Sequence, residues 1–295
     1  MKKNIVNNKT IKKIVASLLI AGSVASVTAC GSTDTGNDAK TNEDGVTKIV
    51  FAYRNTGNWP TTGEDESGNP SGYDIEVLRE VDALLEDYEF EFVGTSYDDA
   101  YIGIEAGNYD AALTNAFWTE ERSQKYLIPE QNLGASVLDL VVRAENSDIK
   151  NLTDLSNSGL ELAPILAGNG MYYVVKTYNE ENPDAQVEIT TTDDSTYVAG
   201  SVEEVVAGKY DAAIHVKASF DATVVAEDGD LHDYLDKISY SEFSLAKTYP
   251  MFSKSVGEDF LKEFNDALTQ VVESGKASEY SQQFYGYDIF NYDFQ

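Results

Sequence analysis

The chain has 295 residues and a formal net charge of −30 at pH 7, with 51 acidic against 21 basic residues. A surface this acidic repels nucleic acid and anionic lipid, which excludes the polyanion-binding classes of protein. The single cysteine excludes an internal disulfide framework, and the length suffices for two α/β lobes or one large domain.

The N-terminal segment has the pattern of an export signal. Residues 1–13 carry five lysines and no acid, and residues 14–27 form an apolar stretch that is too short for a stable membrane span. The sequence Val27-Thr28-Ala29-Cys30 resembles the lipobox of bacterial lipoproteins, whose cysteine is lipidated and becomes the mature N-terminus. We therefore expect a lipoprotein signal peptide over 1–29 and a lipid anchor on Cys30. The alternative is a plain secretory signal with an unmodified cysteine.

Removal of residues 1–29 leaves 266 residues and lowers the formal net charge from −30 to −35. Residues 31–45 are rich in Gly, Ser, Thr, Asn and Asp and contain no apolar cluster. This composition predicts a flexible tether, so that 30–45 would link the anchor to a folded domain.

Two successive α/β units are predicted after the tether. In the first, strands are expected over 48–53, 88–93 and 109–113, and helices over 73–85 and 98–106. In the second, strands are expected over 137–142, 160–165, 187–190 and 211–216, and helices over 152–155, 170–178 and 202–207. Apolar residues at helical spacing predict a last helix over 258–274. In the first unit, the alternation of strands and helices favours a parallel sheet covered by helices.

Short motifs in this order resemble a known family, the polar amino-acid-binding proteins of bacterial ABC importers (extracellular solute-binding proteins, family 3). The motifs that carry the resemblance are Gly72-Tyr73-Asp74, the stretch 97–111 ending Ala106-Gly107-Asn108-Tyr109-Asp110-Ala111, Thr119-Glu120-Glu121-Arg122, Gly208-Lys209-Tyr210-Asp211-Ala212, Ser274-Gly275-Lys276 and Tyr285-Gly286-Tyr287-Asp288. The resemblance covers nearly the whole mature chain.

The resemblance implies two Rossmann-like α/β lobes joined by two crossing strands, with a ligand cleft between the lobes, as in type II periplasmic-binding proteins. Lobe one is expected over 46–143 plus 242–295 and lobe two over 144–241. Residues 141–143 and 243–245 would belong to the crossing strands, and closure around the ligand would be a hinge motion.

Arg122 occupies the family's carboxylate-binding position. The chain has only four arginines against 17 lysines, and the planar guanidinium matches a carboxylate bidentately. The alternative is a surface ion pair of Arg122 with Glu120 or Glu121. Tyr97 stands where the family places an aromatic that stacks on the ligand, and it could instead be a core tyrosine.

Further ligand contacts are expected in three groups. The loop after the first strand contributes Tyr53, Arg54 and Trp59, although Trp59 could simply cap the core. The start of the helix at 170 contributes Asn169, Gly170 and Met171, whose backbone N–H groups could approach an anion, or form an ordinary strand-to-helix turn. Asn115 and Phe117 stand where the family often has glycine or small hydroxyl residues.

One position departs from the family. Val216 replaces the aspartate that usually pairs with the ligand ammonium, and Lys217 follows it. Asp193 or Asp194 could substitute for the missing acid, and an amino-acid derivative or a carboxylate without an amine stays open as the ligand.

The resemblance predicts a lipid-anchored solute-binding protein that captures a small polar ligand, an amino acid or derivative, for an ABC permease. No cofactor and no catalysis are expected, and His215 and His232 lack the spacing of a metal site. We expect a monomer on the extracytoplasmic face of the cell membrane of a Gram-positive bacterium. The alternatives on the same fold are a sensor, an adhesin, or the binding domain of a cell-wall lytic enzyme.

Overall fold

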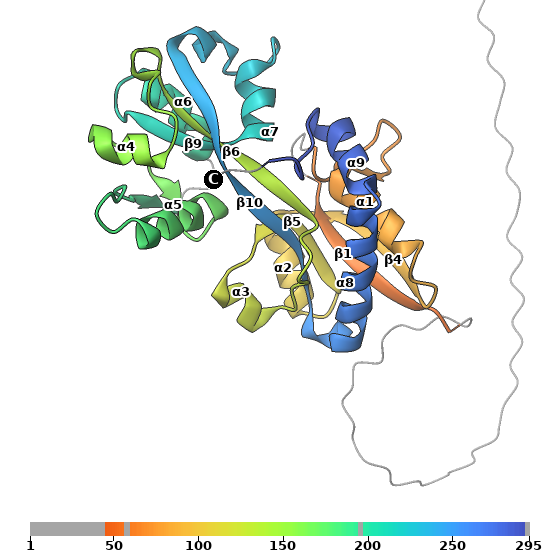
Figure 1. Ribbon diagram of the computed structural model, residues 1–295. Coiled ribbons are helices and arrows are strands. Elements are labelled where there is room, and N and C mark those ends of the chain that lie inside the picture. The colour runs from red at the N-terminus through yellow and green to blue at the C-terminus, as the bar shows by residue number, and fades with distance from the viewer. Residues whose placement is uncertain (1–44, 56–59, 194–196, 293–295) are drawn as a thin grey trace, which may run out of the picture. The chain divides into compact units, whose positions relative to one another are not determined.

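The computed structural model describes residues 45–55, 60–193 and 197–292. The expectations on the signal peptide, Cys30, most of the tether and Trp59 lie outside these residues. Within them, no helix is both long and apolar enough to cross a membrane. The fold is α/β, with a six-stranded sheet of order β4-β1-β5-β10-β6-β9 (Figure 1).

The strands are β1 (Thr47–Arg54), β2 (Gly63–Glu64), β3 (Pro70–Ser71), β4 (Tyr88–Thr95), β5 (Ala111–Phe117), β6 (Gly134–Arg143), β7 (Ile165–Leu166), β8 (Thr191–Thr192), β9 (Ala212–Val216) and β10 (Ile238–Phe252). The α-helices are α1 (Tyr73–Asp82), α2 (Tyr97–Glu105), α3 (Glu120–Lys125), α4 (Leu152–Ser158), α5 (Gly170–Glu181), α6 (Tyr197–Val206), α7 (Lys217–Phe220), α8 (Glu258–Glu273) and α9 (Lys276–Tyr285). Short helical turns cover 144–146, 221–225, 232–237 and 254–256.

The parallel arrangement expected for the first unit is confirmed for β1, β4 and β5, and the complete six-stranded sheet is mixed. β1 runs parallel to β4 and β5, whereas β10 is antiparallel to both β5 and β6, and β6 is antiparallel to β9. The longest antiparallel pair is that of β6 and β10, which extends from Gly134↔Thr248 to Arg143↔Ile238. Figure 1 shows this long pair passing between the two groups of helices.

Two main hydrophobic clusters lie on the two sides of this pair. Cluster one contains Phe51 of β1, Leu78 of α1, Phe252 of β10 and Phe264 of α8, so it joins both ends of the folded chain. Cluster two contains Leu138 and Leu140 of β6, Leu155 of α4, Val175 of α5 and Ile214 of β9. In Figure 1, α8 and α9 lie beside α1, as cluster one requires. The limits proposed for the two lobes stay a prediction.

Several elements differ from the sequence expectations. The strand expected over 160–165 is reduced to β7, and Leu162 makes only an isolated bridge to Ala212. The strand expected over 187–190 is displaced to β8, because Val187 is held by the amide side chain of Asn179 instead of a neighbouring strand. The helix α9 was not expected, and its start at Gly275 has a positive φ of 84°, which glycine adopts at little cost.

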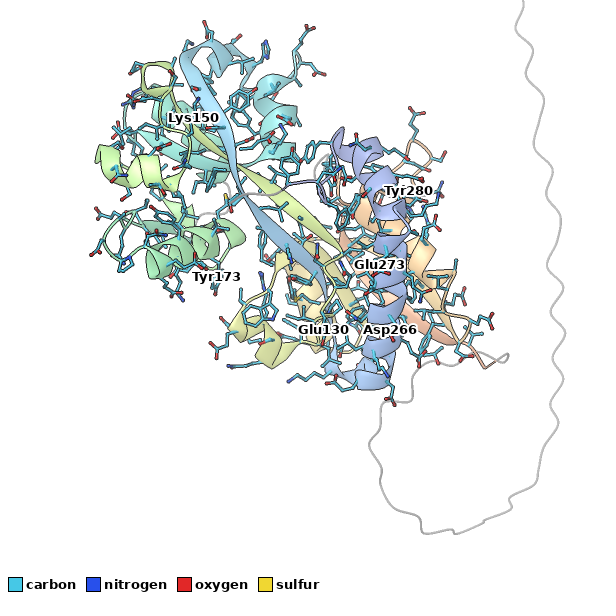
Figure 2. All side chains as sticks on the ribbon, in the orientation of Figure 1. Glu130, Lys150, Tyr173, Asp266, Glu273 and Tyr280 are labelled. Carbon is cyan, nitrogen blue, oxygen red and sulfur yellow. The ribbon has the colours of Figure 1, made fainter. Side chains whose placement is uncertain are left out.

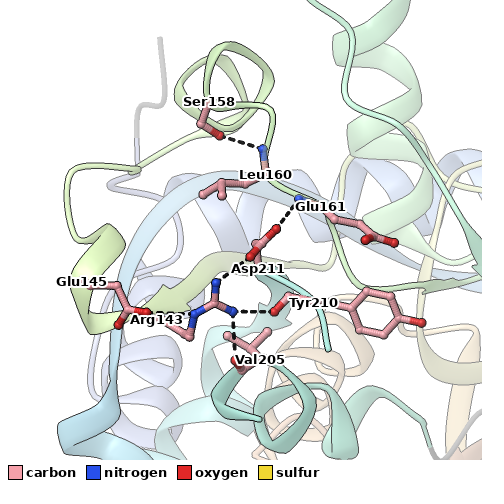
Figure 3. Close-up of polar contacts among 8 residues, drawn as sticks. All are labelled: Arg143, Glu145, Ser158, Leu160, Glu161, Val205, Tyr210 and Asp211. Atoms are coloured by element: carbon pink, nitrogen blue, oxygen red, sulfur yellow. Dashed lines mark hydrogen bonds and ion pairs between the residues drawn. The ribbon is translucent and has the colours of Figure 1, made fainter. Parts of the chain in front are cut away.

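Arg143 shows how the end of β6 is fixed. Its guanidinium donates to the backbone carbonyls of Val205 and Tyr210, at 3.2 and 2.8 Å, and forms ion pairs with Glu145 and Asp211 (Figure 3). Asp211 also accepts the backbone N–H of Glu161, and these bonds lower the pKa of its carboxyl group. This arginine therefore ties β6 to α6 and β9 and has a structural role.

Candidate functional site

Arg122 lies in α3, which begins after Thr119. The Thr119 hydroxyl accepts the backbone N–H of Arg122 at 3.1 Å and so caps the helix. The guanidinium donates from Nη1 to the carbonyl of Phe117 at 2.8 Å and from Nη2 to the hydroxyl of Tyr97 at 3.4 Å. Both partners are uncharged, so the guanidinium is oriented without being neutralised by them.

The surface ion pair considered as an alternative for Arg122 is not formed. Glu121 pairs with Lys125 at 3.0 Å, one turn along α3. Among the residues that the structure describes, neither Glu120 nor Glu121 forms an ion pair with Arg122. An oriented arginine whose charge is not met by a neighbouring carboxylate is suited to bind an external one.

Tyr97 opens α2 beside this guanidinium and is 40% exposed. Its ring lies 5.3 Å from the ring of Tyr101, which in turn lies 5.6 Å from the ring of Tyr126. The Tyr101 hydroxyl shares a hydrogen bond of 2.8 Å with Thr114 of β5. This row of rings holds α2 against the sheet and leaves the first ring accessible.

Asn115 interrupts β5 with a positive φ of 53°, a value that favours glycine and is tolerated best by asparagine and aspartate among the other residues. Its amide donates to the hydroxyl of Ser136 on β6 at 3.0 Å. The backbone conformation therefore restricts which residues fit at this position, and asparagine is one of them.

The expected residues at the start of α5 have different surroundings. Asn169 caps the helix, since its side-chain oxygen accepts the N–H of Tyr172 at 2.9 Å. Gly170 lies directly against the ring of Phe117. Met171 is 7% exposed and packs within cluster two, so its side chain faces the core.

Tyr53 and Arg54 lie at the end of β1. Tyr53 is 2% exposed in cluster one and donates to Glu64 at 3.5 Å, and burial followed by this carboxylate raises the pKa of its hydroxyl. The carbonyl of Arg54 accepts the hydroxyl of Thr62 at 2.8 Å. Tyr53 and Arg54 thus lie beside the β2–β3 hairpin. The other predicted residues Tyr97, Phe117, Arg122 and Gly170 contact one another in a chain and form one group, the Arg122 group.

Val216 ends β9 opposite Leu138 and packs against cluster two. Lys217, the next residue, forms ion pairs with Asp221 at 3.0 Å and Glu242 at 3.3 Å, and its ammonium lies 5.5 Å from the centre of the Tyr287 ring. These partners raise the pKa of the Lys217 ammonium although burial opposes the charge. Lys217 is therefore engaged within the protein.

Asp139 is a residue of interest that the sequence analysis missed. It is fully buried on β6, and within the described residues neither carboxyl oxygen has a hydrogen-bond partner. Burial raises the pKa of its carboxyl group to about 7, with Asp221 and Glu242 acting in the same direction and Lys217 against them. The signal in the sequence was an acid within the apolar run Val137–Val142.

A cavity of about 710 Å³ adjoins the Arg122 group. It is shared by α4, α5 and β10 and includes Phe117 and Gly170. Six aromatic side chains line it: Phe117, Trp118, Tyr173, Tyr178, Phe243 and Tyr249; Tyr173 is labelled on α5 in Figure 2. In the described part of the chain, no group of three or more potential ligands could hold a metal ion.

Two relatives of similar sequence are named as amino-acid-binding proteins. A relative from Haemophilus influenzae, named a probable amino-acid ABC transporter-binding protein, is 27% identical over 237 residues, covering 78% of this chain and 82% of the relative. The L-cystine-binding protein TcyA of Bacillus subtilis is 24% identical over 290 residues, covering 95% and 99%.

Solved structures show the same fold. The extracellular-binding protein ytmK of Bacillus subtilis superposes with a TM-score of 0.60 at 22% identity, covering 82% of this chain and 98% of that one. A structure concerned with glutathione import through GshT and the cystine importer TcyBC of Streptococcus mutans superposes with a TM-score of 0.59 at 24% identity. The match covers 83% of this chain and 97% of that one. The expected two-lobed α/β fold is confirmed. The family model of the bacterial extracellular solute-binding proteins, family 3, matches residues 49–287, and the chain belongs to this family.

Proposed function

We propose that this protein is a lipid-anchored binding protein that captures an amino acid of the cystine type and delivers it to an ABC permease. Three Bacillus subtilis relatives are named as L-cystine-binding proteins, and another is named as arginine-binding. The proposal includes removal of residues 1–29, attachment through Cys30 and a role as a monomer outside the cell membrane.

The observation that carries the proposal is the geometry around Arg122. Two neutral acceptors, the Phe117 carbonyl and the Tyr97 hydroxyl, orient the guanidinium beside an exposed aromatic ring. A ligand carboxylate can then be bound through charge-assisted hydrogen bonds, each worth about 1.5–3 kcal/mol net. The ring of Tyr97 offers a stacking face to the rest of the ligand.

The missing acid at Val216 limits how the amine is bound. The side chain of Val216 packs against cluster two, and Lys217 is held by Asp221 and Glu242, so neither offers a partner to an ammonium group. We propose that the ligand's binding energy comes mainly from its carboxylate and side chain. Cystine carries two ammonium groups that meet the same lack of an acid, but its second carboxylate and its longer side chain offer contacts that a simple aliphatic amino acid lacks.

A thermal-shift panel tests this function. The purified protein would be heated with each of the 20 standard amino acids, L-cystine, glutathione and simple carboxylates. Ligand at 100 times its dissociation constant adds about 2.7 kcal/mol to the stability of the folded protein, which corresponds to roughly 5–10 °C in Tm for a domain of this size. Stabilisation by L-cystine or a related amino acid supports the proposal, and no shift with any amino acid contradicts it.

A sensor or adhesin role on the same fold would give the same panel result. Uptake separates the two: deletion of the gene should abolish import of the ligand. Retained import after deletion would favour sensing. We propose binding without catalysis, and peptidoglycan cleavage by the purified protein would overturn that part of the proposal.

A further inference from the structure

The residues that follow α9 return to the crossing strands. Gly286 ends α9 with a positive φ of 77°, which glycine adopts at little cost, so the chain can turn back there. Figure 1 shows the chain running from α9 towards β6 and β10, close to α7. The segment 286–292 therefore leads from the helices packed on cluster one (α1, α8 and α9, the first helix group) to the helices that lie between β6 and β10 in the chain (α4 to α7, the second helix group).

The segment 286–292 is fixed to the first helix group. The hydroxyl of Ser281, a fully buried residue of α9, donates to the carbonyl of Tyr287 at 2.7 Å and accepts the N–H of Ile289 at 3.0 Å. The side chain of Ile289 is itself buried within cluster one. The backbone around Tyr287 is thus held in place by α9 and by the core beneath it.

Two tyrosine rings of the same segment reach the other side. The ammonium of Lys217 on α7 lies 5.5 Å from the centre of the Tyr287 ring, within the range of a cation–π interaction. The ring of Tyr292 lies 5.8 Å from that of Tyr287, at nearly a right angle. Burial, followed by the carboxylate of Glu242 on β10, raises the pKa of the Tyr292 hydroxyl to about 12, so this ring lies beside the crossing pair.

Lys217 is held firmly on its own side of the contact. Its ammonium forms ion pairs with Asp221 at 3.0 Å and with Glu242 at 3.3 Å, and its side chain is only 15% exposed. A cation–π interaction is stronger when the cation is removed from water than at an exposed site. The contact between Lys217 and Tyr287 therefore joins two positioned groups, one from each helix group.

The contact lies beside an irregularity in the crossing pair. The register between β6 and β10 shifts between Glu242, which faces Asp139, and Ser244, which faces Leu138. One residue of β10, Phe243, is therefore left without its own partner on β6, as in a β-bulge, which bends a strand locally. A bend in one crossing strand is a place where the two helix groups can move relative to each other, and Glu242 stands at its edge.

We propose that the segment 286–292 is a strap that ties α7 to the first helix group beside this bulge and restrains the relative motion of the two helix groups. In the same arrangement, the ring of Phe117 on β5 lies against Gly170 on α5, so the strap also preserves a contact within the Arg122 group. By keeping these residues together, it raises the affinity for a ligand that touches both sides. This consequence rests on the proposed function, whereas the strap itself rests on the contacts of Lys217 and Tyr287.

Distances between labels on the two helix groups test the strap without any ligand. Because Cys30 is the only cysteine, the Cys30→Ser protein with Glu180→Cys on α5 and Lys262→Cys on α8, both at exposed positions, carries one pair of spin labels. Tyr287→Leu should widen the distribution of label distances about twofold, because the ring that Lys217 contacts is lost. Tyr287→Phe keeps the ring face and should leave the distribution unchanged. An unchanged distribution in Tyr287→Leu would overturn the strap.

A double-mutant cycle tests whether Lys217 and Tyr287 act through their contact. Tyr287→Leu should lower the Tm by about 2–4 °C, and by less than half of that in a Lys217→Met background, because the partner is already absent. Equal losses in both backgrounds would contradict the proposal. The matched control is the ammonium of Lys237, 4.9 Å from the ring centre of Tyr234 within the single helical turn 232–237. Lys237→Met removes a cation–π contact that joins no separate parts, and a wider distance distribution in this variant would also count against the strap.

Titration with L-cystine tests the consequence for binding. Tyr287→Leu should bind about three- to tenfold more weakly than the unmodified protein, mainly through faster dissociation, while Tyr287→Phe and Lys237→Met should match it within about twofold. Unchanged or tighter binding by Tyr287→Leu would overturn the role of the strap in binding. If no variant binds L-cystine, the proposed ligand is wrong, and the label distances and the double-mutant cycle alone decide on the strap.

Discussion

Replacing Asp139 by asparagine should stabilise the protein at pH 8 and have little effect at pH 4. The pKa of the Asp139 carboxyl group lies at about 7, against an ordinary value of 3.8, chiefly because the group is buried. A carboxyl group whose pKa is higher in the folded than in the unfolded state contributes full stability below about pH 4. That contribution is lost as the pH rises through about 7.

The expected gain in stability follows from the difference between the pKa of Asp139 in the folded protein and its ordinary value. Each tenfold change in proton affinity is worth about 1.4 kcal/mol, so complete loss would amount to about 4 kcal/mol. The pKa of about 7 already includes the attraction of Lys217 for the ionised carboxylate, whereas a buried asparagine amide keeps the cost of an unpaired polar group and so offsets part of the gain. We therefore expect Asp139→Asn to raise the free energy of unfolding at pH 8 by about 1–3 kcal/mol.

The ionisable groups around residue 139 are the same in the Asp139→Asn variant and in the unmodified protein. Glu242 is paired directly opposite on β10 and His215 on β9, while Lys217, Asp221 and Tyr287 approach from α7, the following turn and the C-terminal segment. His215, whose pKa burial lowers to about 4, and Asp74, whose pKa burial raises to about 7, titrate in both proteins. The difference between the two stability curves therefore isolates Asp139.

The assay is urea unfolding at unit steps from pH 2 to pH 8. Asp211→Asn provides a control of opposite sign, because bonds from Glu161 and Arg143 lower the pKa of Asp211. It should destabilise the protein at pH 7, by about 1–2 kcal/mol, and lose its effect as the pH falls below about 4. A pH-independent effect of Asp139→Asn, or destabilisation at pH 8, would refute the reasoning.

Three further predictions concern binding and the anchor. Arg122→Lys should recover only part of the affinity that Arg122→Ala loses, because an ammonium group cannot form the bidentate fork, and equal affinity of the lysine variant in calorimetry would count against bidentate binding. Simple aliphatic amino acids should bind weakly because Val216 replaces an acid and leaves an ammonium group without a partner, and micromolar binding of several of them would sink this idea. Cys30→Ser should leave the protein unprocessed or release it into the medium, as detected in cell fractions, and continued membrane attachment with cleavage at the same position would show that Cys30 is not lipidated.

The sequence was most informative where one element buries one apolar face. The helix over 258–274 and the strand at 48–53 were predicted closely, because their apolar residues repeat with the period of a single face. The strands at 160–165 and 187–190 were predicted wrongly, since a short apolar run does not say whether a neighbouring strand is available. The 15-residue β10 was recognised only at 243–245, because its sides face different cores along its length.

Sequence motifs predicted individual residues of the site but not the contacts between distant parts of the chain. Two separate motifs predicted Arg122 and Tyr97 as ligand contacts, and the structure joins their side chains through one hydrogen bond. The contact between Phe117 and Gly170 joins residues far apart in the chain, and no local pattern specifies which ring lies on a glycine. The burial of Asp139 depends likewise on β10 and α7 covering β6.

The central claim, that Arg122 binds the carboxylate of an amino-acid ligand, is tested most directly by isothermal titration with L-cystine. The unmodified protein should bind with a micromolar or lower dissociation constant, and Arg122→Ala should bind roughly 30- to 1,000-fold more weakly, a loss of about 2–4 kcal/mol. Less than a threefold change, in a variant that unfolds at the same temperature as the unmodified protein, would contradict the account.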